Sequence, residues 1–476
     1  MSILMKIKLI AIIIALLFFA SYNKTALQIY YSGQTRGDLT NFSQAMYNSS
    51  LGRYMQNTFN YSLHNFWGGR ELNIPTDSSI FGIHLNPILT LFIPIYKLYP
   101  NPTTLITIQT FLACLGSIFI VFLAQKNKIT LIGIVGQILF LSHPSLRSAV
   151  YSEFHAYTLS IFFVSGFIYF ISTKPKHWTT IIFFILSLSI QENVSMTIFL
   201  YCLILSMFNK KNRTYYLILA ITSIAYFFIS TKIIIPHLSN YKSYIFEAVY
   251  GNKLGGSFYD MAQNSLKNPQ LFIEVFFSKE NIKYIGSLTR PAIFSIFSPV
   301  LYIASVFSLL SSLISSSSLL KSQAMHYEAL FVPFVYFAWL NTFKKISQKH
   351  GLFSIMLALL TLTSLIGSIN KINTNLSNKF ANIKPFDPQL EEIIPLVQAN
   401  ASLSTQDHLS VFFTNRSQLY LFPVYSTQSD YVLLSKKDIW PLKEEEQSQE
   451  IKKLNKTHNL NYENTSYLLY KKIILK

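Results

Sequence analysis

The chain has 476 residues, of which 51% are hydrophobic and only 13% charged, and its mean hydropathy is +0.34. Soluble domains carry about 25% charged residues, so this composition excludes an ordinary globular enzyme, a disordered scaffold and a nucleic-acid-binding domain. The formal net charge of +18 is unevenly spread: residues 371–476 contain 13 Lys/Arg against 11 Asp/Glu, and residues 1–370 contain 26 against 10. This excess lies in short clusters between apolar runs, which is typical of a membrane protein.

Apolar runs along the chain predict transmembrane helices, each of which needs about 20 mostly apolar residues. We expect an α-helical polytopic membrane protein with about 11 such helices, and the number of crossings within 282–319 stays open. The predicted spans are residues 7–22, 103–124, 129–142, 156–172, 178–190, 193–209, 214–235, 282–298, 300–319, 327–343 and 351–370. Residues 1–25 would alternatively be a cleaved signal peptide, but FFASYNKT lacks a small-residue cleavage site, which favours an uncleaved span.

Basic clusters orient the predicted bundle. Five segments carry twelve Lys/Arg and no acid, namely Lys6 and Lys8; Lys126 and Lys128; Lys174 and Lys176; Lys210, Lys211 and Arg213; and Lys344, Lys345 and Lys349. They share one side only if residues 84–99 do not cross, so LNPILTLFIPIYKLYP predicts an interfacial or re-entrant helix. The positive-inside rule then predicts a cytoplasmic N-terminus. The Lys/Asn-rich composition and the scarcity of cysteine favour a bacterial inner (cytoplasmic) membrane.

Three long segments fall on the predicted outer side: residues 23–102, 236–281 and 371–476. The first is expected to contain interfacial helices. The last is polar, with helices predicted for PQLEEIIPLVQANA and KEEEQSQEIKKLNK and strands for SQLYLFPV, SDYVLLSK and TSYLLYKKIIL. This pattern predicts a small extracytoplasmic α/β domain after a transmembrane domain of residues 1–370.

Acids and histidines gather at the predicted outer ends of the spans. Acids close to a bilayer are costly and need a partner or a role. The residues concerned are Asp38, His84, Glu153, His155, Glu192 and His326. Their convergence from distant parts of the chain predicts a site on the outer face. The alternative is that outer loops are simply polar and that each acid pairs with an arginine, such as Arg36, Arg70, Arg147 or Arg290.

Individual residues suit particular roles. Asp38, in RGDLTNFSQ, is suited to act as a general base toward an acceptor hydroxyl or to hold a metal ion, or to cap a helix that begins at Leu39. His84, in FGIHLNPIL, is suited to bind phosphate as a cation or to cap its own turn. Glu153 and His155, in YSEFHAYTL, predict either a carboxylate–imidazole pair or a solvated loop pair.

Glu192, in SIQENVSM, lies so close to two apolar runs that we predict a role in function or in a polar network, and His326 and Tyr327 enter the tenth predicted span. The chain has no DxD pair, no zinc-type His/Cys spacing, no Walker loop, no GxGxxG after a strand and no GxSxG. Nucleotide-driven transport and hydride transfer therefore have no support. The cofactor is unassigned, and a divalent metal stays open without a DxD motif.

These motifs together resemble a family of predicted multi-pass membrane proteins (domain of unknown function 2079), which is similar to the C-type glycosyltransferase superfamily. The likeness spans nearly the whole chain. It rests on Asp38, Phe42 and Gln44 in DLTNFSQ, His84 and Pro87 in HLNPIL, Phe154 and His155 in EFH, Glu192 in QEN, His326 and Tyr327 in HYEALFVPF, and Asn415 and Arg416 in FFTNRSQLYLFP. The chain departs from the family pattern at Thr40, Ser43, Ile83 and Glu153.

The resemblance implies a C-type glycosyltransferase bundle that passes a sugar from a polyprenyl phosphate or diphosphate carrier to an acceptor on the outer face. The partners implied are membrane lipid and a polyprenyl-linked sugar donor, with no nucleic acid. By position, the catalytic residues would be Asp38, Glu153 and His155. The substrate-binding residues would be Gln44, His84, Arg147, Glu192, Arg290, His326 and Tyr327, with Arg147, Arg290 or a histidine neutralising the leaving phosphate.

Two other functions compete with this hypothesis. A membrane transporter or lipid flippase would place charged residues near the bilayer midplane and often show inverted repeats, whereas here the acids lie at the outer ends and no repeat is visible. A non-catalytic scaffold of the cell envelope would act through the C-terminal domain. An outer cavity lined by Asp38, His84 and Glu153 would favour the transferase.

Overall fold

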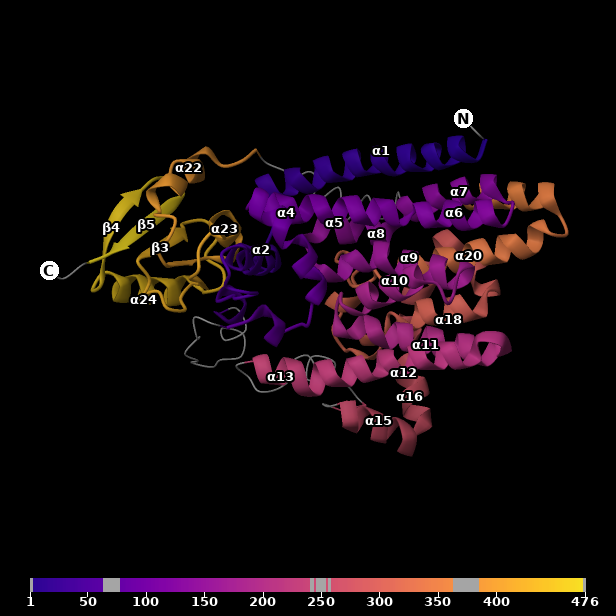
Figure 1. Ribbon diagram of the computed structural model, residues 1–476. Helices are drawn as coiled ribbons and strands as arrows, with labels where there is room; N and C mark the ends of the chain where they lie inside the picture. Colours follow the sequence, from indigo (N-terminus) through magenta and orange to yellow (C-terminus); the bar gives the residue numbers. More distant parts are fainter. Residues whose placement is uncertain are drawn as a thin grey trace.

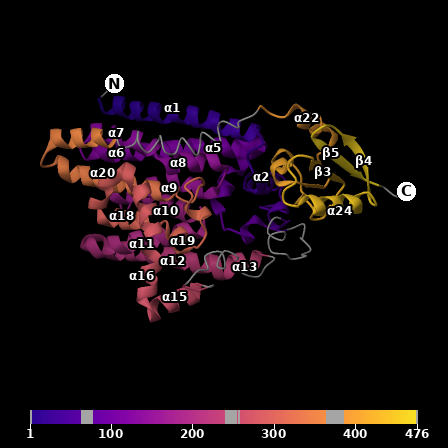
Figure 2. The ribbon, with the colours of Figure 1, turned by 180° about the vertical axis from the view of Figure 1, so that it is seen from behind.

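The computed structural model describes residues 3–62, 78–239, 244, 254–255, 258–362 and 385–473. Long helices lie side by side in a bundle, and a small sheet with short helices lies at one end of it (Figure 1). The first helix begins at the opposite end, as Figure 2 also shows from behind. The predicted fold class, a polytopic α-helical membrane protein with a small C-terminal α/β unit, is confirmed.

The bundle consists of α-helices of very different lengths. They are α1 (Ile3–Tyr31), α5 (Pro102–Gly116), α6 (Ile118–Lys126), α7 (Thr130–Leu141), α8 (Pro144–Ser152), α9 (Ser160–Thr173), α10 (Trp178–Leu188), α11 (Glu192–Phe208), α12 (Arg213–Ile229), α13 (Ile235–Leu238), α15 (Phe258–Lys267), α16 (Pro269–Phe276), α17 (Lys279–Thr289), α18 (Pro299–Phe307), α19 (Leu310–Ile314) and α20 (Phe331–Ser347). A further apolar helix covers Gly351–Leu362, and residues 363–370 of the last predicted span lie outside the described residues.

Within the described ranges, four helical segments are long and apolar enough to cross a membrane: Met5–Tyr31, Pro102–Lys126, Ala156–Thr173 and Lys210–Leu238. Other predicted spans consist of shorter or broken helices. The predicted span 282–298 is α17 followed by a 3-10 segment, η6 (Arg290–Phe297), in which Pro291 cannot donate an α-helical hydrogen bond. The predicted span 300–319 is divided between α18 and α19.

Helix α20 is the central helix of the bundle. Its first ten residues, FVPFVYFAWL, are apolar on every side, as expected for a helix surrounded by protein. Each of them is buried, and Trp339 packs against Phe343 one turn further on. Helix α1, by contrast, exposes Leu9, Leu17 and similar side chains along its length. The bundle therefore buries the first ten residues of α20 and leaves α1 at the periphery with an exposed apolar surface.

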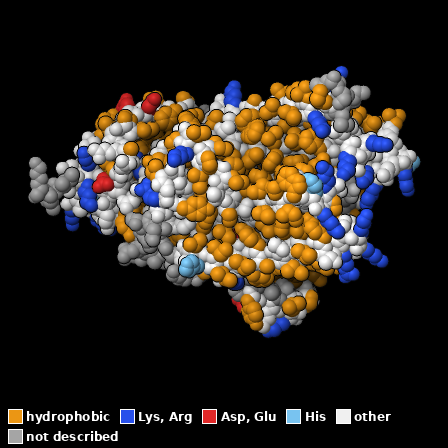
Figure 3. Space-filling model, viewed as in Figure 1, with side chains coloured by type: hydrophobic (Ala, Val, Ile, Leu, Met, Phe, Trp, Pro, Cys, Tyr) orange, Lys and Arg blue, Asp and Glu red, His pale blue; other side chains and the backbone are white. Residues whose placement is uncertain are grey.

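The basic clusters come together at the end of the bundle where α1 begins. Lys8 of α1 lies over the Phe122 ring of α6, and Lys126 donates a hydrogen bond to the Thr173 carbonyl. Lys128 lines a hollow together with Gln348, which follows α20. Figure 3 shows Lys and Arg gathered at this end, separated from the C-terminal domain by a broad apolar surface. The described structure thus gives the bundle one strongly basic end.

The segment after α1 forms short helices at the other end: α2 (Gly37–Ser50), η1 (Ile80–Gly82), η2 (Pro87–Phe92) and α4 (Ile93–Leu98). The predicted interfacial or re-entrant helix over 84–99 is therefore a 3-10 segment followed by a short α-helix. Pro87 stands at the start of η2 and Pro94 near the start of α4, where a missing N–H is tolerated. Its position relative to a membrane stays a prediction.

The C-terminal domain contains a five-stranded sheet in the order β2-β1-β3-β5-β4. Its strands are β1 (Leu403–Thr405), β2 (Leu419–Leu421), β3 (Tyr431–Ser435), β4 (His458–Glu463) and β5 (Tyr467–Lys472). β1 is parallel to β2 and β3, whereas β5 is antiparallel to β3 and β4. Helix α24 (Glu444–Leu454) matches the predicted charged helix, but PQLEEIIPLVQANA forms only α22 (Pro388–Glu391) and the 3-10 turn η8 (Ile394–Leu396).

The segment that follows α2 ties the C-terminal domain to the bundle. Phe59 is fully buried in the core between β1, β3 and short helices of the domain. Thr58 accepts from the Leu419 N–H and donates to the Leu419 carbonyl, and the Ser62 hydroxyl accepts from the Leu421 N–H. These contacts cover the β2 edge, which would otherwise present unpaired backbone groups. The domain is therefore built around a piece of the N-terminal segment.

Candidate functional site

Helix α2 carries Asp38 at the end of the bundle nearest the C-terminal domain. Asp38 is the second residue of α2, and the N-cap position is held by Arg36, whose backbone is extended. The interpretation of Asp38 as a cap for a helix beginning at Leu39 is therefore wrong. The Asp38 side chain is 48% exposed, although most of α2 around it is buried. This leaves its carboxylate accessible on a helix that is otherwise packed into protein.

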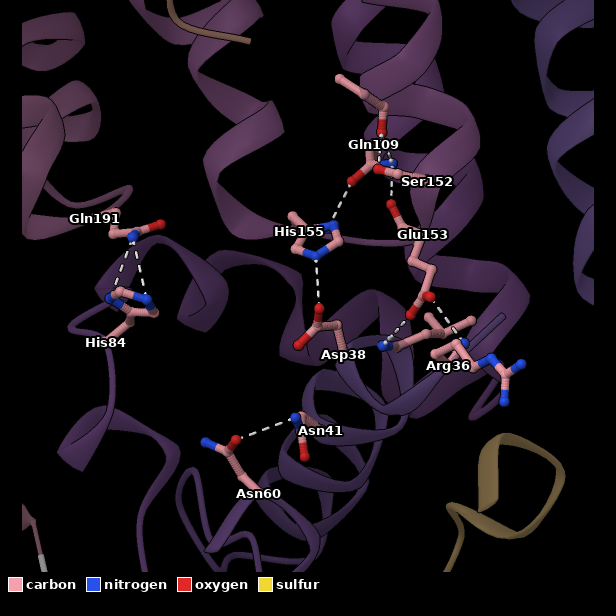
Figure 4. Close-up of polar contacts among 12 residues, drawn as sticks. Arg36, Asp38, Asn41, Asn60, His84, Gln109, Ser152, Glu153, His155 and Gln191 are labelled. Carbon is pink, nitrogen blue, oxygen red and sulfur yellow. Dashed lines mark hydrogen bonds and ion pairs between the residues drawn. The ribbon is translucent and has the colours of Figure 1, made fainter. Parts of the chain in front are cut away.

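His155 is the buried partner of the Asp38 carboxylate. Its Nε2 lies 3.0 Å from Asp38 Oδ2, and its side chain is only 7% exposed (Figure 4). The Gln109 amide of α5 accepts from the His155 N–H at 2.8 Å and donates to the Glu153 carbonyl at 2.8 Å. Gln109 thereby fixes the turn that carries His155. The site therefore contains an exposed carboxylate in contact with a buried imidazole.

Glu153 does not pair with His155, so this part of the prediction is wrong. Its φ of 142° is in a region that L-residues rarely adopt, and it turns the Glu153 side chain toward α2. The carboxylate accepts the Arg36 N–H at 2.8 Å through Oε1 and the Leu39 N–H at 3.1 Å through Oε2. Burial and then the Asp38 carboxylate raise the pKa of Glu153 well above its ordinary value, against the effect of these two donors. Glu153 therefore holds the N-terminus of α2.

His326 and Tyr327 extend the cluster. The His326 ring stacks on the His155 ring with centroids 3.4 Å apart, and Tyr327 lies beside it at 4.5 Å. Burial lowers the pKa of His326 well below its ordinary value, and charges on His155 and His84 lower it further while Asp38 opposes them. His326 is consequently neutral near pH 7 and keeps one ring nitrogen as an acceptor.

A second carboxylate–imidazole pair joins His84 to Glu192. His84 Nδ1 lies 2.6 Å from Glu192 Oε1, and the Leu85 N–H donates to Oε2 at 3.0 Å. The Tyr244 hydroxyl also donates to Oε1, at 2.9 Å, and the Gln191 amide lies 3.1 Å from His84 Nδ1. Glu192 is fully buried, whereas the His84 side chain is 23% exposed. In this pair the imidazole is therefore partly exposed and the carboxylate is buried.

Three further ionisable residues near the α2 N-terminus were missed in the sequence: Asp407, His408 and Asp438. Asp407 is buried, and Asp438 lies 3.5 Å from both Arg36 and His408. Burial, followed by the Asp38 and Asp438 carboxylates and against Arg36, raises the pKa of Asp407 to about 7. The adjacent Asp407 and His408 are the residue types sought in the bundle, and the His408 ring lies beside Asp438, but the tail had been interpreted as a separate domain.

Gln44 has a different environment from the exposed residues. It is fully buried and bonds to Thr58 and to the carbonyls of Arg416 and Ser417, and its oxygen accepts from the Thr58 and Phe59 N–H groups. Gln44 therefore links α2 to the C-terminal domain. Its predicted role in binding substrate stays a prediction.

The two arginines expected at the phosphate lie in different surroundings. Arg147, in α8, is half-buried, and its charge acts on the buried tyrosines Tyr22 and Tyr151. Arg290 is exposed at the start of η6, and within the described part of the chain no recorded contact joins it to the histidine cluster. Arg36 pairs with Asp438, and Arg70 lies outside the described residues. The recorded hydrogen bonds to Asp38, Glu153 and Glu192 come from imidazole rings, backbone N–H groups and the Tyr244 hydroxyl.

No group of three or more His, Cys, Asp or Glu side chains suited to hold a metal ion occurs among the residues that the structure describes. Asp38 and Glu153 both lie at the α2 N-terminus, but the Glu153 carboxylate accepts from two backbone N–H groups. Carboxylates and imidazoles at this position are suited to act as a general base and to stabilise charge.

A family model described as a predicted membrane protein family (DUF2079) matches residues 34–472. The chain belongs to this family. No curated protein matches the chain. Nine chains of solved structures do. Two are crystal structures of ArnT from Cupriavidus metallidurans, one bound to undecaprenyl phosphate and one in the apo state, at 10% and 9% sequence identity. Each alignment covers 95% of this chain and 97% of that chain, with TM-scores of 0.45 and 0.46.

Proposed function

We propose that this protein is a membrane glycosyltransferase that moves a sugar from a polyprenyl-phosphate-type donor to an acceptor on the outer face of the membrane. The observation that carries the proposal is the pair of oppositely oriented dyads. Asp38 is half-exposed with His155 buried behind it, and His84 is partly exposed with Glu192 buried behind it. Transfer of a sugar from phosphate to a hydroxyl needs both a base and a cation, and these two dyads offer one of each.

Asp38 acts as the general base. The acceptor oxygen attacks the anomeric carbon of the donor, the bond from that carbon to the phosphate oxygen breaks, and the acceptor proton passes to the Asp38 carboxylate. His155, held by Gln109, orients Asp38 through the 3.0 Å contact, so that the carboxylate needs little rearrangement in the transition state. Glu153 positions Asp38 through the α2 backbone.

His84 acts on the leaving phosphate. Glu192 lies 2.6 Å from Nδ1 and fixes the orientation of the His84 ring. A protonated His84 would offer a cation and a hydrogen-bond donor to the phosphate oxygens as their charge grows. His326 and Tyr327 lie beside Asp38 and His155 and are suited to contact the sugar. Metal dependence, the sugar and the acceptor are not assigned.

The sidedness of this proposal rests on charge. Helix α2, which carries Asp38, lies beside the C-terminal domain, whereas α1 begins at the opposite end of the bundle (Figure 1), where Lys8 and Lys126 lie. Under the positive-inside rule the basic end faces the cytoplasm, so the dyads and the C-terminal domain face outward. A polyprenyl phosphate anchors its tail in the bilayer and places its phosphate at this interface. The bacterial inner membrane and the cell envelope are the proposed setting.

Mass spectrometry of lipid-linked sugars and envelope glycans, with and without the gene, tests the proposal. We expect a polyprenyl-linked sugar to accumulate and its glycan product to disappear when the gene is deleted. Wild-type protein should restore the product and Asp38→Asn should not. Restoration by Asp38→Asn at wild-type abundance would defeat the assignment of Asp38, and unchanged lipid-linked sugars on deletion would defeat the transferase proposal.

A further inference from the structure

A hollow opens at the basic end of the bundle, between two connections of helices. One is the turn from α6 to α7, and the other is the turn from α20 to the apolar helix Gly351–Leu362. Its volume is about 480 Å³. Lys128, Thr130 and Gln348 are among its polar lining residues, and Leu131 and Ile355 are among the apolar ones. The hollow can therefore contact both a charged group and a hydrocarbon chain.

The hollow lies where apolar helices end. The helical segment Pro102–Lys126 is long and apolar enough to cross a membrane, and it stops directly before the turn that lines the hollow. Leu131 of α7 and Met356 of the helix after α20 are exposed apolar side chains near it. The end of such a segment marks the boundary between hydrocarbon and headgroups. A molecule in the hollow would therefore have its polar part among headgroups and its apolar part beside the lipid chains.

The two segments that line the hollow carry charge of one sign. Residues 118–132 and 340–357 contain five lysines and no Asp or Glu. Figure 3 shows Lys and Arg gathered at this end of the bundle. Basic pockets between transmembrane helices bind the phosphate of lipid headgroups. The complementary occupant is therefore an anion.

Lys128 stands where the backbone favours glycine. Its φ is 61°, in the left-handed region. The Ile129 N–H donates to the Ala124 carbonyl, as in helix ends that carry Gly or Asn in this conformation. The Lys128 N–H donates to the Gln125 carbonyl, which completes the same motif. A lysine is less stable here than a glycine, because its Cβ crowds the backbone. The local structure does not explain this lysine, which points to a use for its charge.

We propose that this hollow binds the headgroup of an anionic phospholipid, with Lys128 as its cation. The Lys128 ammonium donates charge-assisted hydrogen bonds to the phosphate oxygens. The Thr130 hydroxyl and the Gln348 amide are further donors at the hollow. Leu131 and Ile355 contact the first carbons of the acyl chains. A soluble phosphate would bury no apolar surface against them, so the lining favours a lipid. This site is independent of sugar transfer.

Native mass spectrometry of the full-length protein tests the proposal. The protein is released from nanodiscs that contain phosphatidylglycerol and phosphatidylcholine in equal amounts, in about 0.5 M salt, which largely screens attraction between surface charges. We expect wild type to retain phosphatidylglycerol in preference. Lys128→Gly should lower this retention about 10-fold, because a charge-assisted hydrogen bond is lost, and Lys128→Arg should preserve it. Equal retention in wild type and Lys128→Gly would overturn the proposal.

Two further variants separate a site from a basic surface. Lys176 is an exposed lysine in the turn between α9 and α10 and does not line the hollow, so Lys176→Gly should change retention less than about twofold in the same salt. Ser347→Trp fills the hollow from its other wall without changing the charge, and it should lower retention. Equal loss in Lys176→Gly and Lys128→Gly, or unchanged retention in Ser347→Trp, would overturn the site.

Melting temperatures separate lipid binding from the backbone effect. In phosphatidylcholine nanodiscs Lys128→Gly should melt no lower than wild type, because glycine fits the left-handed conformation. In phosphatidylglycerol nanodiscs wild type should gain on the variant, because a ligand of the folded state stabilises it. The same difference in both lipids would overturn the proposal. It would also be overturned if glycerol phosphate stabilised wild type as much as phosphatidylglycerol does, or if polyprenyl phosphate were retained in preference to phosphatidylglycerol.

Discussion

The two carboxylate–imidazole dyads contain the same groups in opposite orientations. In the first, Asp38 is 48% exposed and His155 is buried; in the second, His84 is 23% exposed and Glu192 is fully buried. The buried partner fixes the orientation of the exposed one. An exposed carboxylate suits a general base, whereas an exposed imidazole suits a contact to phosphate. Orientation, rather than composition, therefore separates their chemistry.

The dyads also differ in what holds them. The first depends on a helix turn that is hydrogen-bonded by Glu153 and by Ser410 of the C-terminal domain, so its geometry involves that domain. The second depends on hydrogen bonds to Glu192 from Leu85 and Tyr244, which belong to segments that follow the first and seventh predicted spans. A perturbation of the C-terminal domain should therefore affect the base far more than the cation.

The largest effect is expected from Asp38→Asn, which tests the base assigned to the first dyad. Asparagine keeps the size of the side chain and a contact to His155 but cannot accept the acceptor proton. We expect kcat for sugar transfer to fall roughly 100- to 10,000-fold, the usual contribution of a general base. The measurement is transfer by purified protein, and polyprenyl phosphate binding should stay within about twofold of wild type. A matching loss of polyprenyl phosphate binding would show that Asp38 also contributes to donor binding and does not act only as the general base.

His84→Gln tests the proposed contact between His84 and the donor phosphate. Glutamine retains a hydrogen-bond donor but cannot carry the positive charge of a protonated imidazole. Charge-assisted hydrogen bonds contribute about 1.5–3 kcal/mol. We therefore expect a polyprenyl phosphate in nanodiscs to bind about 10- to 100-fold more weakly, measured by native mass spectrometry or phosphorus NMR. His155→Gln serves as the control from the other dyad. Equal weakening in both variants would show that the dyads do not divide base and cation between them.

A pH series tests whether the first dyad depends on contacts with the C-terminal domain. The pKa of Asp407 is raised from 3.8 to about 7, so the folded state binds its proton more tightly than the unfolded chain does. Stability at the α2 junction should consequently fall as the pH rises from about 4 to about 7. We expect exchange of residues 36–40, corrected for intrinsic rates, to rise several-fold over this range. Asp407→Asn should flatten that dependence, and an unchanged slope would contradict the role of Asp407.

Tyr244→Phe should have the smallest effect. It removes one hydrogen bond to Glu192, at 2.9 Å, and leaves the His84 contact in place. A neutral hydrogen bond contributes about 0.5–1.5 kcal/mol, so polyprenyl phosphate should bind about 2- to 10-fold more weakly. In a double-mutant cycle with His84→Gln the two effects should not add, because both act through Glu192. Full additivity would place Tyr244 outside the dyad.

Particular residues show which parts of the structure could be predicted from the sequence. The apolar runs and lysine clusters predicted the helical membrane bundle, because apolar length and charge placement are properties of the chain alone. Asp38, His84, His155, Glu192 and His326 were identified by their cost near hydrocarbon, and the structure brings them together. The partner of Glu153 was predicted wrongly, because the backbone angle that turns its side chain toward α2 depends on long-range packing.

Local composition alone determined that this protein is a multi-span helical membrane protein with one basic end and a polar C-terminal domain, since hydropathy and charge need no knowledge of contacts. Only the tertiary structure decided which acid meets which imidazole, which member of each dyad is exposed, and that Ser410 contacts Thr40, 370 positions earlier. Those outcomes depend on burial, and burial is decided by which distant segments pack together.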